Sequence, residues 1–364
     1  MKKILTICST LDFQNYTRRA TIEAIAQKAG RLDVVLYTGL KNRFTPKNLS
    51  PHLNTTIHHF WIPESLNRFP VLRSLETAVR KPFRKRAFAG YDVIFFTDPN
   101  QYRLLPYVGD QTVVYLIRDP NILQAEAHRE GEKALLDQAG LVLATSRNLA
   151  ESYLPKYYGF QHSNIQYWPN CADLELWKAE DKKPSQTKNS PVIGVAGNFS
   201  KKRTDYELLT AIAENLPEYR FEIAGMIDRD QNPVFWDSLL AKENIAYLGL
   251  LPLDELPETV AGWNVGLVTD RVDEYASYMH HNKVYQYLAM GVPVVSMRIH
   301  DDYELLKPCV ESAKSHEEYT ELIWTQADRQ KAEIFRKSCR SLAVENSAEK
   351  RAEQFMDYIE ERCE

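Results

Sequence analysis

The chain has 364 residues, a formal net charge of -4, and 44% hydrophobic, 26% charged and 11% aromatic residues. This composition is that of an ordinary globular protein and excludes an intrinsically disordered chain, while the length predicts two domains. With a sequence pI near 6.2, the whole chain does not attract nucleic acid or anionic lipid, so any such partner must bind a local patch.

The cysteines and the N-terminus indicate a cytoplasmic protein. The five cysteines are scattered and never spaced as C-x-x-C, a pattern that argues against a disulfide framework or a zinc site. The first apolar run ends where the sequence turns polar at Ser9, so this run is too short for a secretion signal. No stretch approaches the roughly 18 apolar residues of a membrane span. We therefore expect a cytoplasmic protein that makes peripheral contact with the inner face of the plasma membrane.

Short apolar runs alternate with longer amphipathic stretches in the first half of the chain. Strands are predicted at residues 3–8, 33–37, 56–61, 92–96, 112–117 and 141–144, and helices at 18–29 and 122–139. This alternation is typical of a parallel sheet covered by helices. Residues 1–178 are therefore predicted to form a Rossmann-like domain.

The segment from Ser65 to Arg86 interleaves basic and apolar residues. Its cations are Arg68, Arg73, Arg80, Lys81, Arg84, Lys85 and Arg86. A basic amphipathic helix of this kind suits an anionic membrane surface, and a solvated helix face is the alternative. Nucleic acid is not expected as a partner because no aromatic platform accompanies the charges.

Candidate acid–base residues follow predicted strands of the first half. Ligands of open parallel sheets bind beyond the carboxyl ends of the strands, and Asp119 follows the strand at 112–117. Asp119 is the first candidate for a general base, with capping of a helix near Asn121 as the alternative. Asp12 and His128 are reserve candidates, whose alternatives are a loop-structural role for Asp12 and a surface or core position for His128.

A polar linker is predicted at residues 179–191, and a second alternating series follows it. Strands are expected at 192–197, 220–224, 245–248, 264–268 and 292–296. Residues 192–345 are therefore predicted to form a second Rossmann-like domain. Residues 346–364 are predicted to form a helix that packs back on the first domain, because apolar residues recur in it at three-and-four spacing.

Two motifs of the second domain suit a phosphorylated ligand. After the strand at 192–197, a turn carries Asn198, Lys201 and Arg203 before a helix begins, and cations at a helix N-terminus suit a diphosphate. A solvated basic turn is the alternative. Further along, Asn282 and Lys283 open a predicted helix.

Gln286 follows Lys283 by one turn and shares its face of that helix. Glycine and proline then end the helix before a buried strand.

Residues 282–295 (NKVYQYLAMGVPVV) resemble the signature K-x-x-E-Y-x-A-x-G-x-P-V-V of group 1 bacterial glycosyltransferases with the GT-B fold. Four further segments are similar to motifs of that family. Residues 144–146 (ATS) match V-x-A-x-S, 168–173 (WPNCAD) match x-P-N-G-V-D, 192–209 (VIGVAGNFSKKRTDYELL) match I-G-x-x-G-x-x-x-x-R-x-D-x-x-L-L, and 247–249 (YLG) match V-x-F-L-G. Each segment alone is a weak signal, but their order and spacing make chance agreement improbable.

The resemblance implies an α/β protein of the GT-B fold, in which two Rossmann-like domains face each other across a cleft and the C-terminal helix crosses back to the N-terminal domain. It implies a nucleotide-diphosphate sugar as donor, with a UDP-sugar favoured, and no cofactor or metal. The predicted donor-binding residues are Asn198, Lys201, Arg203, Gly225, Leu250, Asp270, Asn282, Lys283 and Gln286. Lys283 and the turn at 198–203 would hold the diphosphate, and Gln286 would bind the ribose. Gly225 and Leu250 would lie near the nucleotide base.

The predicted activity is sugar transfer to a hydroxyl of a glycan or lipid-linked acceptor, a hexosyltransferase reaction of bacterial surface polysaccharide assembly. Where the family has glutamate for the ribose, this chain has Gln286, and the residue eight positions earlier is Tyr278. The paired glutamates of many retaining members are thus absent, which favours inversion. The alternatives are a nucleotide-sugar 2-epimerase and a catalytically silent binding module of a polysaccharide-assembly complex.

Overall fold

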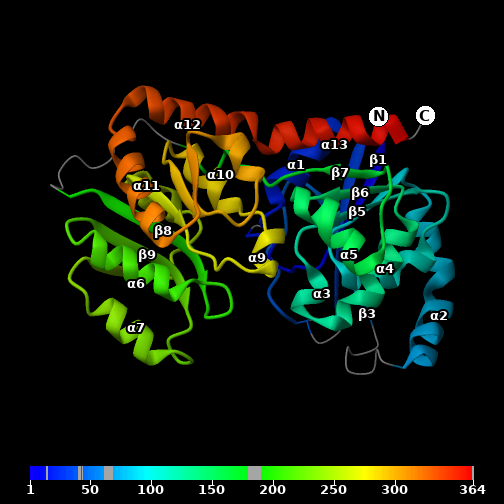
Figure 1. Ribbon diagram of the computed structural model, residues 1–364. Helices are drawn as coiled ribbons and strands as arrows, with labels where there is room; N and C mark the ends of the chain where they lie inside the picture. Colours follow the sequence, from blue (N-terminus) through cyan, green and yellow to red (C-terminus); the bar gives the residue numbers. More distant parts are fainter. Residues whose placement is uncertain (14, 40–41, 43, 61–68, 179–189, 363–364) are drawn as a thin grey trace. The chain divides into compact units, whose positions relative to one another are not determined.

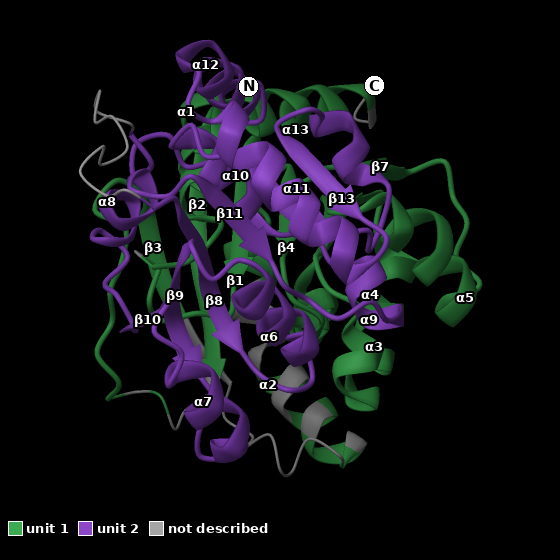
Figure 2. Ribbon diagram, turned by 60° about the vertical axis from the view of Figure 1, so that its left-hand side comes forward, with its two compact units in different colours: residues 1–169, 348–364 green, residues 170–347 purple. Residues whose placement is uncertain are grey.

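The computed structural model describes residues 1–13, 15–39, 42, 44–60, 69–178 and 190–362 (Figure 1). The chain divides into two compact units, which Figure 2 colours separately. Unit 1 comprises Met1–Pro169 and Ala348–Glu364, and unit 2 comprises Asn170–Ser347. The first four residues of the basic segment, 65–68, and residues 179–189 of the predicted linker lie outside the described residues.

Unit 1 is built on a parallel sheet whose described strands follow the order β3-β2-β1-β4-β5-β6-β7. They are β1 (Lys3–Cys8), β2 (Arg31–Gly39), β3 (Asn54–Phe60), β4 (Val93–Phe96), β5 (Thr112–Ile117), β6 (Leu141–Ala144) and β7 (Ile165–Tyr167). Buried on both faces, these strands are nearly continuous apolar runs, which is why the sequence reveals most of them. The short β7 is only half-buried and was not predicted.

Helical segments connect these strands. They are α1 (Arg19–Lys28), α2 (Pro70–Phe88), η3 (Pro99–Tyr107), α3 (Asn121–Gln124), η4 (Glu126–His128), α4 (Arg129–Gln138), η5 (Leu149–Tyr153) and α5 (Leu154–Tyr158). The helix predicted at 122–139 is wrong as one element. Ala125 has the extended angles φ -157 and ψ 127, so the chain stops after one turn and restarts.

The C-terminal helix α13 (Ala348–Arg362) packs in unit 1, beside α1 (Figure 1). Phe355 is fully buried, with its ring centroid 5.0 Å from that of Phe95 and 6.0 Å from that of Trp168. The indole of Trp168 donates to the Arg351 carbonyl at 2.9 Å. The prediction that the final helix crosses back to the N-terminal domain is confirmed, and burial of its apolar stripe is the physical reason.

Unit 2 holds a second parallel sheet, with described strands in the order β10-β9-β8-β11-β12-β13. They are β8 (Val192–Phe199), β9 (Arg220–Ile227), β10 (Ile245–Gly249), β11 (Val265–Val268), β12 (Val294–Met297) and β13 (Val310–Ala313). The chain leaves β8 toward β9 on one side, while β11 lies on the other side. Such a reversal of strand order places the ligand crevice of an open α/β sheet at the carboxyl ends of β8 and β11.

The helices of unit 2 are α6 (Tyr206–Asn215), α7 (Pro233–Leu240), α8 (Leu256–Ala261), α9 (Glu274–Tyr278), α10 (Asn282–Ala289), η6 (Asp302–Leu306), α11 (His316–Arg329) and α12 (Glu333–Glu345). Residues 170–178, which the sequence placed in the first domain, lie with this unit. The Ala172 amide donates to the Asn346 carbonyl at 3.0 Å, and Trp177 is buried in the core of unit 2.

Candidate functional site

Two glycines end the neighbouring strands β8 and β9 in unit 2. Gly197 and Gly225 are register partners, with φ angles of +157° and +128° that favour glycine. A Cβ on Gly225 would lie 1.8 Å from the Gly197 carbonyl oxygen, so this strand end tolerates no side chain. A Cβ built on Gly197 would lie 3.5 Å from the amine of Lys283. The Lys283 amine therefore lies against the end of β8.

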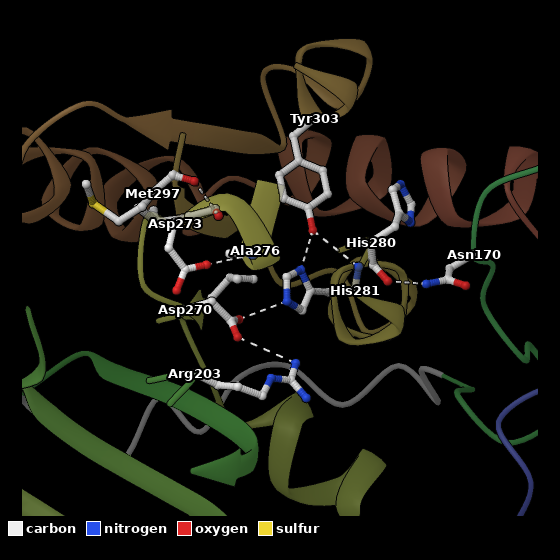
Figure 3. Close-up of polar contacts among 12 residues, drawn as sticks. Asn170, Arg203, Asp270, Asp273, Ala276, His280, His281, Met297 and Tyr303 are labelled. Carbon is white, nitrogen blue, oxygen red and sulfur yellow. Dashed lines mark hydrogen bonds and ion pairs between the residues drawn. The ribbon is translucent and has the colours of Figure 1, made fainter. Parts of the chain in front are cut away.

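A cluster of charged and polar side chains lies beyond the carboxyl ends of β8 and β11, and Figure 3 shows Asp270 between Arg203 and His281. Asp270 lies 2.8 Å from Nε2 of His281 and 3.5 Å from the guanidinium of Arg203. Backbone pairing holds the two loops together, because Thr204 forms a bridge with Asp270 and the Arg271 amide donates to the Arg203 carbonyl at 2.7 Å. We call Arg203, Asp270, His281 and Lys283 the Asp270 cluster.

The charges of this cluster perturb one another. Burial alone would raise the pKa of Asp270, but His281, Lys283 and Arg203 hold the pKa of its carboxyl well below its ordinary value. Burial lowers the pKa of Lys283, Asp270 raises it, and Arg203 lowers it further. Asp270 is thus an ionised counter-ion for cations in a partly dry crevice. Its contacts hold Arg203 and His281 together beyond the carboxyl ends of β8 and β11.

An aromatic wall fixes the orientation of His281. The Tyr303 hydroxyl lies 2.8 Å from Nδ1 of His281, while the opposite ring nitrogen faces Asp270 (Figure 3). His300 packs on Tyr303 with ring centroids 4.4 Å apart. Burial, reinforced by His281, lowers the pKa of His300 to about 4, so His300 is neutral at pH 7. Sequence reasoning missed Tyr303 and His300, which follow the strand β12 without any local motif.

The remaining predicted donor residues lie along the same edge of the sheet. Asn282 is the first residue of α10, and Gln286 lies one turn after Lys283, half-buried. Asn198 is exposed at the end of β8. Leu250 is 72% exposed. It follows β10, which lies two places from β8 in the sheet. Lys201 is exposed in the turn that follows β8.

Asp119 lies half-buried just beyond the carboxyl end of β5 in unit 1. The alternative role that the sequence left open, a helix cap, is not seen. The cap of α3 is Pro120, and no side chain caps that helix. The Asp119 carboxylate therefore does not cap α3.

The two reserve candidates have local structural partners. Both carboxylate oxygens of Asp12 accept hydrogen bonds, from the amides of Asn15 at 2.8 Å and Asn48 at 2.9 Å. The bond from Asn15 is the main cause of a lowered pKa at Asp12, and a lowered pKa makes a carboxylate a weaker base. Nδ1 of His128 lies 3.1 Å from the Asn121 carbonyl oxygen, so one ring nitrogen bonds to the backbone.

A buried carboxylate that sequence reasoning missed lies behind Asp119. Glu132 on α4 is fully buried, and its Oε1 accepts from the Tyr115 hydroxyl at 2.8 Å and the Asn121 amide at 2.6 Å. Its Oε2 accepts from the hydroxyls of Tyr153 at 2.7 Å and Tyr158 at 2.6 Å. Burial raises the pKa of Glu132, and the four hydrogen bonds oppose this effect.

This network supports the backbone next to Asp119. Asn121 opens α3 only two residues after Asp119, and the Ile122 amide donates to the Tyr153 hydroxyl at 3.0 Å. Tyr153 ends the π-helical turn η5, a rare geometry that here aims its hydroxyl at both Glu132 and α3. The partners of Glu132 lie 11 to 26 residues away in sequence, so no local pattern could have revealed the network.

Within the described parts of the chain, no group of three or more His, Cys, Asp or Glu side chains is arranged to hold a metal ion. Likewise, none of the described helices is both long and apolar enough to span a bilayer.

Comparison with known proteins identifies relatives of this chain. The glycosyl transferase-like family profile matches residues 203–357. A Bacillus subtilis (strain 168) protein described as putative teichuronic acid biosynthesis glycosyltransferase TuaH is 24% identical over 145 residues. That match covers 39% of this chain and 36% of the relative's length.

Two solved structures are similar over nearly the whole chain. Sucrose-phosphate synthase from Thermosynechococcus elongatus has 17% identity and a TM-score of 0.74, covering 99% of each chain. HepE from Anabaena, solved in complex with UDP and glucose, has 16% identity and a TM-score of 0.73, covering 99% of this chain and 100% of its own. At these identities the likeness establishes the fold, which confirms the predicted architecture of two parallel Rossmann-like sheets.

Proposed function

We propose that this chain transfers a sugar from a nucleotide-diphosphate sugar to a hydroxyl of a glycan or lipid-linked acceptor, because the glycosyl transferase-like profile matches residues 203–357 and the chain has the GT-B fold. The observation that carries this proposal is the Lys283 amine lying against the bare backbone of Gly197, beside Arg203. Cations at the carboxyl ends of β8 and β11 are placed where such a sheet binds a diphosphate.

The chemistry follows from the departure of the nucleotide. As the bond from the anomeric carbon to the diphosphate breaks, negative charge grows on the phosphate oxygens. Lys283 and Arg203 would stabilise that charge, and Asp270 would hold both cations in place before the donor arrives. Gln286, one turn along α10, would bond the ribose hydroxyls. UDP is the favoured nucleotide, supported by its presence in HepE.

The acceptor hydroxyl needs a base as it attacks the anomeric carbon. We assign this role to Asp119, with inversion at that carbon, because no glutamate pair is available to support retention. The assembly of bacterial surface polysaccharide is the proposed context, supported by the teichuronic acid relative.

A thermal-shift screen against UDP, GDP, dTDP, CMP and their common sugars, with and without EDTA, tests the proposed function. A ligand that binds only the folded protein raises its melting temperature. We expect a selective rise with UDP and one UDP-sugar that EDTA does not abolish. The absence of any shift would favour a silent binding module, and donor turnover without an acceptor would favour a 2-epimerase.

Asp119→Asn tests the base assignment. The substitution keeps the shape of the side chain but removes the proton acceptor, so kcat should fall at least about 100-fold. Because donor binding resides in unit 2, the UDP-induced thermal shift should stay at its wild-type value. Asp137→Asn is the matched control, an exposed carboxylate on α4 of the same unit. Wild-type activity in Asp119→Asn would rule out this residue as the base.

Helix α2 supports a membrane surface as a further partner. Val71, Leu75 and Val79 recur every four residues and are 79%, 62% and 53% exposed, so they form an exposed apolar stripe. Lys85 and Arg86 are exposed in its last turn. A helix that combines an apolar stripe with cations suits the interface of an anionic bilayer.

A vesicle sedimentation assay tests this contact. The wild-type protein should bind vesicles of phosphatidylserine and phosphatidylcholine, should bind those of pure phosphatidylcholine much less, and should dissociate at high salt. The triple variant Val71→Ser, Leu75→Ser and Val79→Ser should lose binding. Ile334→Ser and Val344→Ser serve as a control with exposed apolar residues of unit 2. Equal binding of all variants would indicate that α2 is only a solvated helix.

A further inference from the structure

The carboxylate of Asp228, directly after β9, accepts hydrogen bonds from four donors in unit 2. Its Oδ1 accepts from the Tyr206 hydroxyl and from the Trp236 indole, the latter at 2.8 Å. Its Oδ2 accepts from the Lys201 backbone amide at 3.0 Å and from the Asn232 side chain at 2.7 Å. Burial alone would raise the pKa of Asp228, but the bonds from Tyr206, Trp236 and Lys201 lower it. The carboxylate is therefore ionised at neutral pH.

Three of these donors lie in or next to α6 and α7, where aromatic rings pack closely. Tyr206 stacks on Phe235 with ring centroids 3.8 Å apart, and Trp236 is fully buried with its ring centroid 5.6 Å from that of Tyr206. The fourth donor is a backbone amide of residues 200–204, which we call the Arg203 turn. The Asp228 carboxylate thus ties the Arg203 turn to two packed helices.

The backbone amides of the Arg203 turn are largely paired within the protein. Those of Arg203 and Thr204 donate to the Ser200 carbonyl at 2.9 and 2.7 Å, and that of Lys201 donates to Asp228. A diphosphate would therefore meet the side chains of this turn rather than these three amides. Arg203 contributes its side chain to the Asp270 cluster, so the place of the turn decides where this guanidinium lies.

We propose that Asp228 is a positioning residue for the donor, which holds the Arg203 turn so that the Arg203 guanidinium meets the diphosphate. The inference rests on the proposed function and adds a residue that acts through the turn. The backbone bridge between Thr204 and Asp270 fixes the end of the turn, and Asp228 fixes its beginning through the Lys201 amide. Without this bond the guanidinium would be in place in only a fraction of the molecules, and the donor affinity would fall by that fraction.

Asp228→Asn releases the turn while sparing the core. Asparagine has one acceptor oxygen, which can serve either the Trp236 side or the Lys201 side of the network. Because Trp236 is fully buried and Lys201 is exposed, the oxygen should stay with the indole, since a buried donor without a partner costs more. Asp237→Asn is the matched control, a half-exposed carboxylate on α7 of the same unit.

Calorimetric titration of the full-length protein with UDP measures a double-mutant cycle between Asp228→Asn and Arg203→Gln. Asp228→Asn should weaken UDP binding about tenfold, a coupling expected for residues of one network. Asp237→Asn should keep the wild-type affinity. In the Arg203→Gln background, Asp228→Asn should have no further effect, because the side chain that Asp228 positions is already missing. A residue that only stabilises unit 2 would instead act independently of Arg203.

Two results would overturn the positioning role: wild-type UDP affinity in Asp228→Asn, or effects of the two substitutions that multiply in the double variant. Melting temperatures without ligand report whether each variant is folded. If Asp228→Asn melts far below the wild type, Asp228→Glu replaces it in the cycle, because it keeps the charge but moves the carboxylate, and the same outcomes decide. Failure of the wild-type protein to bind UDP would overturn the proposed function, and the positioning role with it.

Discussion

Lys283→Ala should reduce kcat/KM for the nucleotide-sugar donor by about 100- to 1,000-fold, the effect of removing one charge-stabilising group from an active site. The amine lies against the backbone of Gly197 and beside Asp270, at the carboxyl end of β8. Burial lowers the pKa of Lys283 from its ordinary value of 10.5, and a diphosphate binds its charged form. Donor affinity should therefore fall as the pH rises, below the pH at which an exposed lysine titrates.

Three measurements check this result: steady-state kinetics, the UDP-induced thermal shift, and the pH dependence of UDP affinity. Lys337→Ala is the control, because it removes an exposed lysine of the same unit. Lys283→Ala should leave the melting temperature without ligand close to the wild-type value, since Asp270 keeps its contacts with Arg203 and His281. Undiminished donor turnover in Lys283→Ala would remove this lysine from the site.

Glu132→Ala should lower the free energy of unfolding by more than about 3 kcal/mol, because each buried donor left without a partner costs about 1–3 kcal/mol. Four donors, three tyrosine hydroxyls and the Asn121 amide, would each lose their partner in the interior of unit 1. Unpaired buried donors keep their full desolvation cost. Glu132→Gln should cost less, because the amide oxygen still accepts two of the four hydrogen bonds.

Denaturant unfolding followed by tyrosine and tryptophan fluorescence measures this loss. Asp137→Ala on the same helix is the control, and its surface pair with Lys133 should contribute less than about 1 kcal/mol. The Glu132→Gln protein, if folded, should also lose activity without losing UDP affinity, since the network holds the start of α3 beside Asp119. Equal stability of Glu132→Ala and Asp137→Ala would show that the network is dispensable.

Much of the fold could be predicted because its cause is local. Buried parallel strands must be apolar on both faces, so each forms a short apolar run that a single stretch of sequence reveals. The parallel sheets and the return of the last helix followed from such patterns. The half-buried strand β7 was not predicted, because it is not a continuous apolar run. The interruption of the helix at Ala125 was not predicted either, because it depends on the hydrogen bonds that join the start of α3 to Tyr153 and Glu132.

The candidate site divides in the same way. The sequence by itself determined the two-domain α/β class, the loop carrying Arg203 and the helix that opens with Lys283, because these are contiguous motifs with a local spacing. Only the tertiary structure decided that Asp270 lies between those cations, that Tyr303 orients His281, and that Glu132 gathers three tyrosines. These contacts join residues that are far apart in the chain. The tertiary packing determines which charged and hydrogen-bonding groups meet inside a protein, so no local sequence pattern predicts these contacts.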